Sequence, residues 1–486
     1  MPRFFPPHRS RAVTAALMAL LSGCAVTPEP PGSAIVAPAQ FSEADTARTP
    51  DWPKPDWWHG FGSPELDRMI ARAETDSFDI QAAIARIRQA DAQVKISGAA
   101  LLPNVQALQQ STWTHSYTQT GRQTNSGEFI DTRTTALSAT ASYDLDLWGK
   151  IAAGRDSAVA SAVFSRADRD TVALDTLTAI ATTWFTALAY QDRITVAERN
   201  LSDAEEILKA IRAREAVGTA SDLDVAQQAA LVAGVRASIP GLRSNVTTNL
   251  NALAVLVGQT PEALRLAPRS LIGLSLPDIT PGLPSELLHR RPDLMSAEAQ
   301  LAAARANLRA ARAALYPDIA LTGSGGWSNA ALASLFSPAS VLANAAASVT
   351  QTIFDNGALQ AQLELSAAKR DELVADYRRA IVQAFTDVEN ALAQYRQATD
   401  QERLEAEAVT VAQRAADIAR AQVLAGTSDL VTALQAQSTL FADLDTLAQV
   451  RLSRFNALVA LYKALGGGWT VQSVSPPETH VFQGLL

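Results

Sequence analysis

The chain has 486 residues, enough for several structural units, and only 19% of them are charged. Acidic residues outnumber basic ones by 49 to 41, so no nucleic acid is expected as a partner, because no basic stripe is present to neutralise phosphates. A single cysteine excludes disulfide bonds and cysteine-based metal clusters.

The N-terminal 23 residues have the pattern of an export signal. Three arginines precede an apolar stretch at 12–21, which is too short to cross about 30 Å of hydrocarbon as a helix. Cys24 follows Ser-Gly in a lipobox, so we expect residues 1–23 to be a lipoprotein signal peptide and Cys24 to be the lipid attachment site. Ala25, where an aspartate would favour retention in the inner membrane, favours an outer-membrane location. The alternative is a signal peptide with an incidental cysteine.

Residues 24–60 are rich in proline and have no hydrophobic period, which predicts a solvated, lipidated tether. A helix is then expected to begin at Ser63-Pro64, since serine is a common N-cap and proline suits the first helical position.

The spacing of prolines indicates an internal duplication. Two proline-free tracts of nearly equal length follow Pro103 and Pro338. Residues 79–106 align without gaps onto 293–320, and later landmarks such as Val217-Gly218-Thr219 and Ala425-Gly426-Thr427 recur in the same order. We expect four segments after the tether: a first repeat at 61–265, a linker at 266–291, a second repeat at 292–469 and a C-terminal tail at 470–486.

Each repeat is expected to contain the same elements in the same order. A helix is followed by a strand pair, a very long helix, a Gly-Thr turn and a second long helix. The expected ranges are 78–101, 104–147 and 150–216 in the first repeat, and 292–315, 318–354 and 358–424 in the second.

Alternation of apolar and polar residues predicts the strands, clearest at Leu137, Ala139, Ala141 and Tyr143. The expected strands are 104–120 with 131–147, and 318–327 with 342–354, and each is long enough to cross a bilayer once. Aromatic residues lie near the turns, as in the girdle of a membrane barrel: Trp113, Tyr117, Phe129 and Trp327. Four strands cannot close a barrel, and open edges do not survive in lipid. Two chains would give eight strands and three would give twelve; the residues alone do not choose.

The helices show heptads. Phe441, Ala448, Phe455 and Tyr462 recur every seven residues, which predicts left-handed coiled coils. The longest helices, near 67 residues, would extend on the order of 100 Å and so project well beyond a membrane.

Together these features resemble the TolC/OprM-type outer-membrane factors of the NodT lipoprotein group, over essentially the whole mature chain. The motifs that carry the resemblance are the lipobox at Cys24, Trp57-Trp58, Asp146-Leu147-Trp148-Gly149-Lys150, Arg290-Arg291-Pro292-Asp293-Leu294, Phe354-Asp355-Asn356-Gly357 and Leu461-Tyr462-Lys463-Ala464-Leu465-Gly466-Gly467-Gly468-Trp469.

The resemblance implies a mainly α fold with membrane β structure: a homotrimer whose twelve-stranded β-barrel lies in the outer membrane and continues as a periplasmic α-barrel. It implies a passive exit duct for efflux, partnered by a periplasmic adaptor (membrane fusion protein) and an inner-membrane RND pump, in contact with outer-membrane lipid. The sequence has no catalytic or nucleotide-binding motif, so neither enzyme activity nor any cofactor or metal is expected. The alternatives are an exit duct for type I protein secretion and a non-conducting, lipid-anchored coiled-coil scaffold.

The resemblance also assigns roles to the two Gly-Thr turns, as hairpin tips that dock the adaptor. The tip residues are Gly218, Thr219, Ser221, Asp222 and Leu223 in the first repeat, and Gly426, Thr427, Ser428, Asp429 and Leu430 in the second. Turn and cap chemistry alone would also explain the glycines and the aspartates. Some relatives carry an aspartate ring at the periplasmic gate; here the corresponding positions are Thr432 and Gln435, so a neutral gate with weak cation block is expected.

Overall fold

The computed structural model describes residues 38–42, 52–119, 127–264, 270–277, 279 and 284–468. The chain divides into two units, Met1–Ala37 and Pro38–Leu486, and everything below concerns the second. Cys24, the signal peptide and the C-terminal tail from residue 470 lie outside the described residues.

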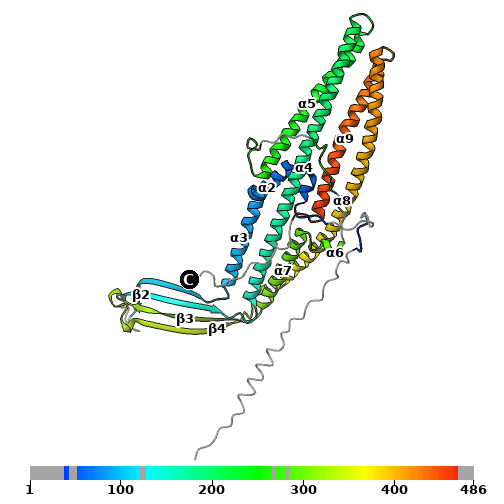
Figure 1. The fold of residues 1–486 in the computed structure, drawn as a ribbon. Coiled ribbons are helices and arrows are strands. Elements are labelled where there is room, and N and C mark those ends of the chain that lie inside the picture. Colours follow the sequence, from blue (N-terminus) through cyan, green and yellow to red (C-terminus); the bar gives the residue numbers. More distant parts are fainter. Residues whose placement is uncertain are drawn as a thin grey trace, which may run out of the picture. The chain divides into compact units, whose positions relative to one another are not determined.

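Helices make up most of the described chain, and the order of elements repeats (Figure 1). A helix, two strands and two long helices occur first as α3-β1-β2-α4-α5 and again as α7-β3-β4-α8-α9. The helices are η1 (Trp57–Phe61), α2 (Pro64–Asp76), α3 (Phe78–Ala99), α4 (Lys150–Glu215), α5 (Asp222–Val257), α6 (Pro284–Leu287), α7 (Pro292–Ala313), η2 (Leu332–Ser334), η3 (Pro338–Ser340), α8 (Ala358–Ala425) and α9 (Leu430–Ala464).

The longest helices match the lengths expected from the sequence, with 66 residues in α4 and 68 in α8. Among the described helices, α4 alone has a stretch apolar enough to cross a membrane, but most of that stretch is buried in the protein. We therefore interpret α4 as the central helix of the helical part.

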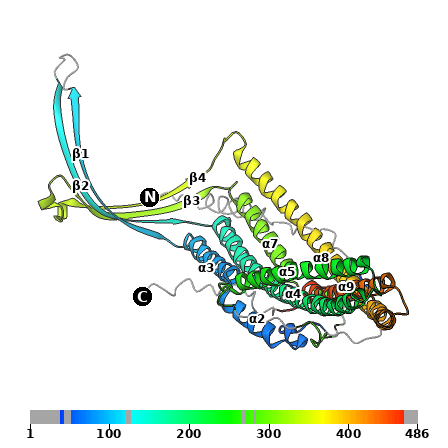
Figure 2. The ribbon, with the colours of Figure 1, turned by 90° about the horizontal axis from the view of Figure 1, so that it is seen from above.

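The four strands form one antiparallel sheet in the order β1-β2-β3-β4. They are β1 (Asn104–Gln119), β2 (Gly127–Asp144), β3 (Asp318–Asn329) and β4 (Val341–Thr350). The pairing of β2 with β3 joins strands from the two halves of the chain. Figure 2 shows the β1–β2 hairpin continuing past the end of β3.

Several strand ends differ from the expected ranges, by one to four residues, and β2 for example ends at Asp144 rather than 147. The two largest differences follow from the strand pairing. β2 begins at Gly127 rather than 131, because its first residues pair with the outer part of β1. β4 ends at Thr350 rather than 354, because Thr350 pairs with Asp318, the first residue of β3. Residues 351–354 thus have no residue of β3 left to pair with.

The largest core cluster gathers aromatic side chains from distant parts of the chain. Trp57 stacks on Tyr462 of α9 with ring centroids 4.8 Å apart, and Phe61 contacts Phe185 of α4 at 4.9 Å. Trp58 is also buried. Trp57 and Trp58, assigned to the tether from the sequence, are thus packed into this core.

Polar residues that interrupt the heptads of α9 have partners on other helices. Gln437 is buried and donates to Asn200 of α4 at 3.2 Å, and Arg451 donates to Glu402 of α8 at 2.9 Å. Both therefore lie in contacts between helices rather than in the solvent.

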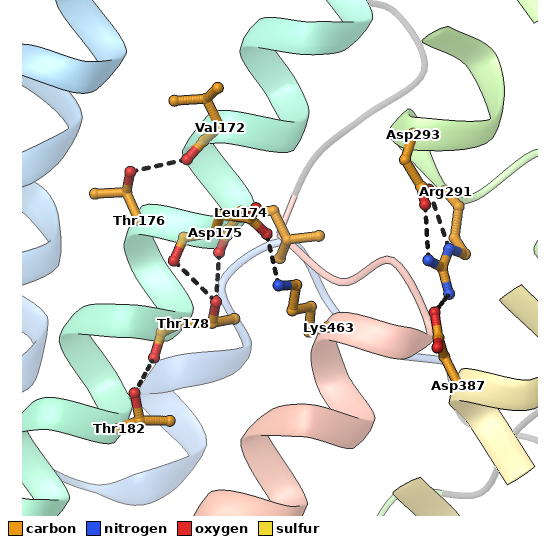
Figure 3. A network of polar contacts seen from close by, with 10 residues as sticks. All are labelled: Val172, Leu174, Asp175, Thr176, Thr178, Thr182, Arg291, Asp293, Asp387 and Lys463. Carbon is orange, nitrogen blue, oxygen red and sulfur yellow. Dashed lines mark hydrogen bonds and ion pairs between the residues drawn. The ribbon is translucent and has the colours of Figure 1, made fainter. Parts of the chain in front are cut away.

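Arg291 connects the start of α7 to α8 (Figure 3). Its guanidinium donates to both oxygens of Asp293, at 3.0 and 2.7 Å, and to Asp387 at 3.0 Å. Burial of Arg291 opposes its charge, but its bonds to Asp293 and Asp387 outweigh burial and raise its pKa. In the same view, Lys463 of α9 forms an ion pair with Asp175 of α4. The Arg290-Arg291-Pro292-Asp293 motif therefore connects the start of α7 to α8.

Candidate functional site

The two faces of the sheet differ in polarity. The register places Trp113 opposite Arg133, Leu137 opposite Trp327 and Trp327 opposite Val341, so these residues share one face. We call it the apolar face. Its apolar members are Val105, Ala107, Trp113, Tyr117, Phe129, Leu137, Ala139, Ala141, Tyr143, Ile319, Leu321, Trp327, Val341, Ala343, Ala345, Ala347 and Val349.

The opposite face, which we call the polar face, is dominated by hydroxyl and amide side chains. They are Asn104, Gln106, Gln110, Thr112, Thr114, Ser116, Thr118, Thr132, Thr134, Ser138, Thr140, Ser142, Thr322, Ser324, Ser328, Asn344, Ser348 and Thr350. Its carboxylates stand at the strand ends: Glu128, Asp144 and Asp318. A surface of this kind suits water on one side and hydrocarbon on the other.

The sheet is open at both edges. β1 pairs only with β2, and β4 only with β3, among the strands that the structure describes. Each edge therefore presents a row of backbone donors and acceptors that another strand could use.

Two aspartates fix the directions in which the long helices leave the sheet. Asp146 accepts from the backbone N–H groups of Ile151 and Ala152 at 3.1 and 2.7 Å, at the start of α4. Asp355 accepts from Gly357 and Leu359 at 2.9 and 2.8 Å, at the start of α8. The bond from Leu359 is the main reason why the pKa of Asp355 lies below its usual range.

The first tip is a turn closed by local hydrogen bonds. Gly218 has a positive φ of 75°, which favours glycine, and Thr219 donates to the Arg214 carbonyl from its N–H at 2.8 Å and its hydroxyl at 2.9 Å. Ser221 and Asp224 form a capping box at the start of α5, and the bonds from Ser221 lower the pKa of Asp224.

The second tip has the same kind of turn, with a glycine of positive φ, a threonine bonded to a helix carbonyl and a side-chain N-cap. Gly426 has a φ of 71°, and Thr427 donates twice to the Gln422 carbonyl, at 2.9 and 3.2 Å. Asp429 accepts from the Thr432 N–H at 2.8 Å and from its hydroxyl at 3.0 Å, which lowers the pKa of Asp429. Ser428, next to the cap, is half-buried.

The leucines of the two tips have different surroundings. Leu223 is exposed, with 64% of its surface accessible, whereas Leu430 is buried against Ile207 and Ile211 of α4. Asp222 is exposed beside Leu223. Val431, which follows Leu430, is 61% exposed and stands at the same position after its N-cap as Leu223 does. Each tip therefore offers an exposed apolar side chain at this position, and the second tip also uses Leu430 to pack α9 onto α4.

Two arginines that sequence reasoning missed connect the tips. Arg214 of α4 donates to the Val423 carbonyl of α8 at 2.8 Å, and Arg420 of α8 pairs with Asp203 and Glu206 of α4. The recurrence of the Gly-Thr turn in the two repeats is the one sequence signal that places residues near 214 and 423 at the same end of the molecule.

Thr432 and Gln435, the expected gate positions, are both exposed and lie almost one turn apart on α9. Their spacing puts them on one side of the helix. The Thr432 hydroxyl donates a hydrogen bond to Asp429, and this carboxylate, which is close to the expected gate, is the N-cap of α9.

Known proteins resemble the chain over most of its length. A family model described as outer membrane efflux protein matches residues 69–259 and again 283–467. The pyoverdine export outer membrane protein OpmQ of Pseudomonas aeruginosa is 39% identical over 456 residues, which cover 93% of this chain and 95% of that protein. The probable efflux pump outer membrane protein TtgC of Pseudomonas putida is 30% identical over 96% of each chain.

The fold agrees with these matches. The solved structure of the outer-membrane channel OprN superposes with a TM-score of 0.84 at 26% identity, covering 92% of this chain and all of that one. The TolC-like fold expected from the sequence is thus confirmed. The chain belongs to the outer membrane efflux protein family, and is an outer-membrane channel component of an efflux system.

Proposed function

We propose that three copies of this chain close a twelve-stranded barrel in the outer membrane and continue into the periplasm as a helical tunnel. The observation that carries this proposal is the open sheet with one polar and one apolar face. Such a sheet is stable in lipid only if its edges are paired. Pairing β4 of one copy with β1 of the next preserves the antiparallel order, turns the apolar face to lipid and leaves the polar face around a water-filled passage.

The helices supply the periplasmic part of the duct. In this proposal, α4, α5, α8 and α9 of each copy form the tunnel, and the two tips dock a periplasmic adaptor bound to an inner-membrane RND pump. Exposed Asp222 and Leu223 of the first tip and Val431 of the second are the best candidates for direct contact, whereas Leu430 supports the second tip from inside. Thr432 and Gln435 would narrow the entrance as the gate.

The lipid anchor is part of the same proposal. Cys24 would carry acyl chains in the periplasmic leaflet, and residues from 25 onward would connect it to the core that begins at Trp57. We also propose that 61–265 and 292–469 are two copies of one duplicated unit, a view supported by the double match of the family model.

Substrate choice is proposed to lie in the pump. The interior of the polar face has no charge in the described strands, so it offers little basis for selecting one solute. One relative is named for pyoverdine export, so pyoverdine is the first substrate to assay.

Bilayer recordings and gel migration test the proposal. The purified chain should migrate as a heat-modifiable trimer and give single-channel conductance in planar bilayers. A non-conducting protein that carbonate extracts from membranes would support the scaffold alternative instead. Deletion of a neighbouring RND pump or of an ABC exporter should then show which of the two depends on the duct.

A further inference from the structure

The outer end of the apolar face carries a cluster of aromatic and charged residues. Cross-strand pairing sets Trp113 opposite Arg133, His115 opposite Asp131 and Tyr117 opposite Phe129, so all six side chains share the apolar face. We call these six residues the girdle cluster.

The length of the strands indicates the depth of this cluster. A tilted strand crosses the hydrocarbon in ~9–11 residues, and Tyr143 on the same face marks the inner end of β2, with Arg133 ten residues away along that strand. β2 pairs with β3 only from Thr135 onward. Arg133 therefore lies where one crossing is complete, at the level of the outer headgroups.

The charges within the cluster are unevenly satisfied. Asp131 Oδ1 lies 2.6 Å from His115 Nδ1, and the His115 ring stacks on Phe129 at 4.9 Å between centroids. Arg133 is exposed and makes no hydrogen bond or ion pair with any residue of the described ranges. A guanidinium at the edge of hydrocarbon is costly without an anionic partner.

We propose that Arg133 and Trp113 bind a phosphate of a phosphorylated glycolipid in the outer leaflet. The planar guanidinium suits bidentate bonding to phosphate, the Trp113 indole opposite it has its N–H to offer, and the acyl chains of the lipid would lie along the apolar face below. The proposed barrel provides three such sites. The inference rests on that barrel, because only a closed barrel turns this face to lipid.

Native mass spectrometry of the trimer in nanodiscs tests the inference, with bisphosphorylated lipid A and its dephosphorylated form as the two probes. Wild type should bind the phosphorylated form preferentially, and Arg133→Gln should bind it roughly tenfold more weakly, the usual effect of one charged hydrogen bond. Arg133→Gln combined with Thr134→Arg, which moves the cation to the polar face, should not restore binding.

The controls separate this inference from the proposed channel. Arg133→Gln should remain a conducting trimer, so that loss of glycolipid binding alone is measured; a wild type that neither trimerises nor conducts would instead refute the channel. Equal binding of the phosphorylated lipid by wild type and Arg133→Gln would overturn the inference. So would competition by millimolar inorganic phosphate, because a free anion lacks the acyl chains that the apolar face holds.

Discussion

At the scale of single residues, Thr432 and Gln435 set how strongly multivalent cations block the proposed gate. Replacing both by aspartate would place six carboxylates at the entrance of a trimer, and close like charges bind multivalent cations strongly. We expect wild type to be blocked weakly by hexamminecobalt(III) in planar bilayers, and Thr432→Asp/Gln435→Asp to be blocked at much lower concentration.

A matched control carries two acids elsewhere. Ser244 and Thr248 are exposed on α5, so Ser244→Asp/Thr248→Asp adds the same charge outside the expected gate and should leave block unchanged. Strong block of the wild type would contradict the neutral gate.

Asp192 of α4 is a buried carboxylate that holds the connection between the two halves. It accepts from the Leu271 N–H at 3.0 Å. Burial raises its pKa, although bonds from Ser270 and Leu271 and the charge of Arg451 act in the opposite direction. Since the folded pKa exceeds the unfolded one, the carboxyl destabilises the fold most above the folded pKa, and this penalty disappears as the pH falls toward the unfolded value near about 4.

Two substitutions of Asp192 separate charge from hydrogen bonding. Asp192→Asn keeps an acceptor and should raise the melting temperature at neutral pH, by an amount that shrinks toward pH ~4. Asp192→Ala should cost about 1–3 kcal/mol, because the Leu271 N–H loses its partner. Thermal melts between these pH values check both; a gain for Asp192→Asn that is independent of pH would rule out the titration argument.

At the scale of elements, Arg291 connects α7 to α8, because its guanidinium donates hydrogen bonds to Asp293 at the start of α7 and to Asp387 of α8. Arg291→Gln would leave Asp293 and Asp387 without their shared cation, and breaking a largely buried pair costs several kcal/mol. Its acidic partners are partly exposed, so we expect about 1–3 kcal/mol. Arg309→Gln is the control, because the Arg309–Asp156 pair is exposed on both sides and should contribute almost nothing; equal effects of the two changes on thermal unfolding would contradict the assignment.

Local patterns predicted the elements well, and non-local pairing explains what they missed. Period-two alternation located β1 to within one residue, and the heptads located α9, because both signals are carried by neighbouring residues. The β2–β3 pairing, the contact of Arg214 with Val423 and the burial of Trp57 depend on residues about 180 to 400 positions apart. The two turns were predicted in the same way. Their glycines and caps were found from the sequence, whereas the burial of Leu430 depends on packing against α4.

The number of copies that close the barrel is a property of the whole molecule. Cys24 is the only cysteine and is proposed to be lipidated. Disulfide bonds between engineered cysteines therefore report contacts between copies, because no other thiol of the chain can react with them. Ser111 on β1 and Ala345 on β4 lie on the same face of opposite edges, so across a shared antiparallel edge cysteines at these positions come within bonding distance when the register is right. Scanning the β4 cysteine over Ala343, Ala345 and Ala347 covers neighbouring registers.

The largest cross-linked species on a denaturing gel then gives the number of copies in the barrel. We expect oxidation of the best pair to give covalent dimers and trimers on denaturing gels and nothing larger, because three chains complete the ring. The pair Gln110→Cys/Ala345→Cys places the two thiols on opposite faces and should not cross-link. A ladder that ends at the dimer would mean eight strands instead of twelve, and the passage would then be narrow enough for side chains to fill.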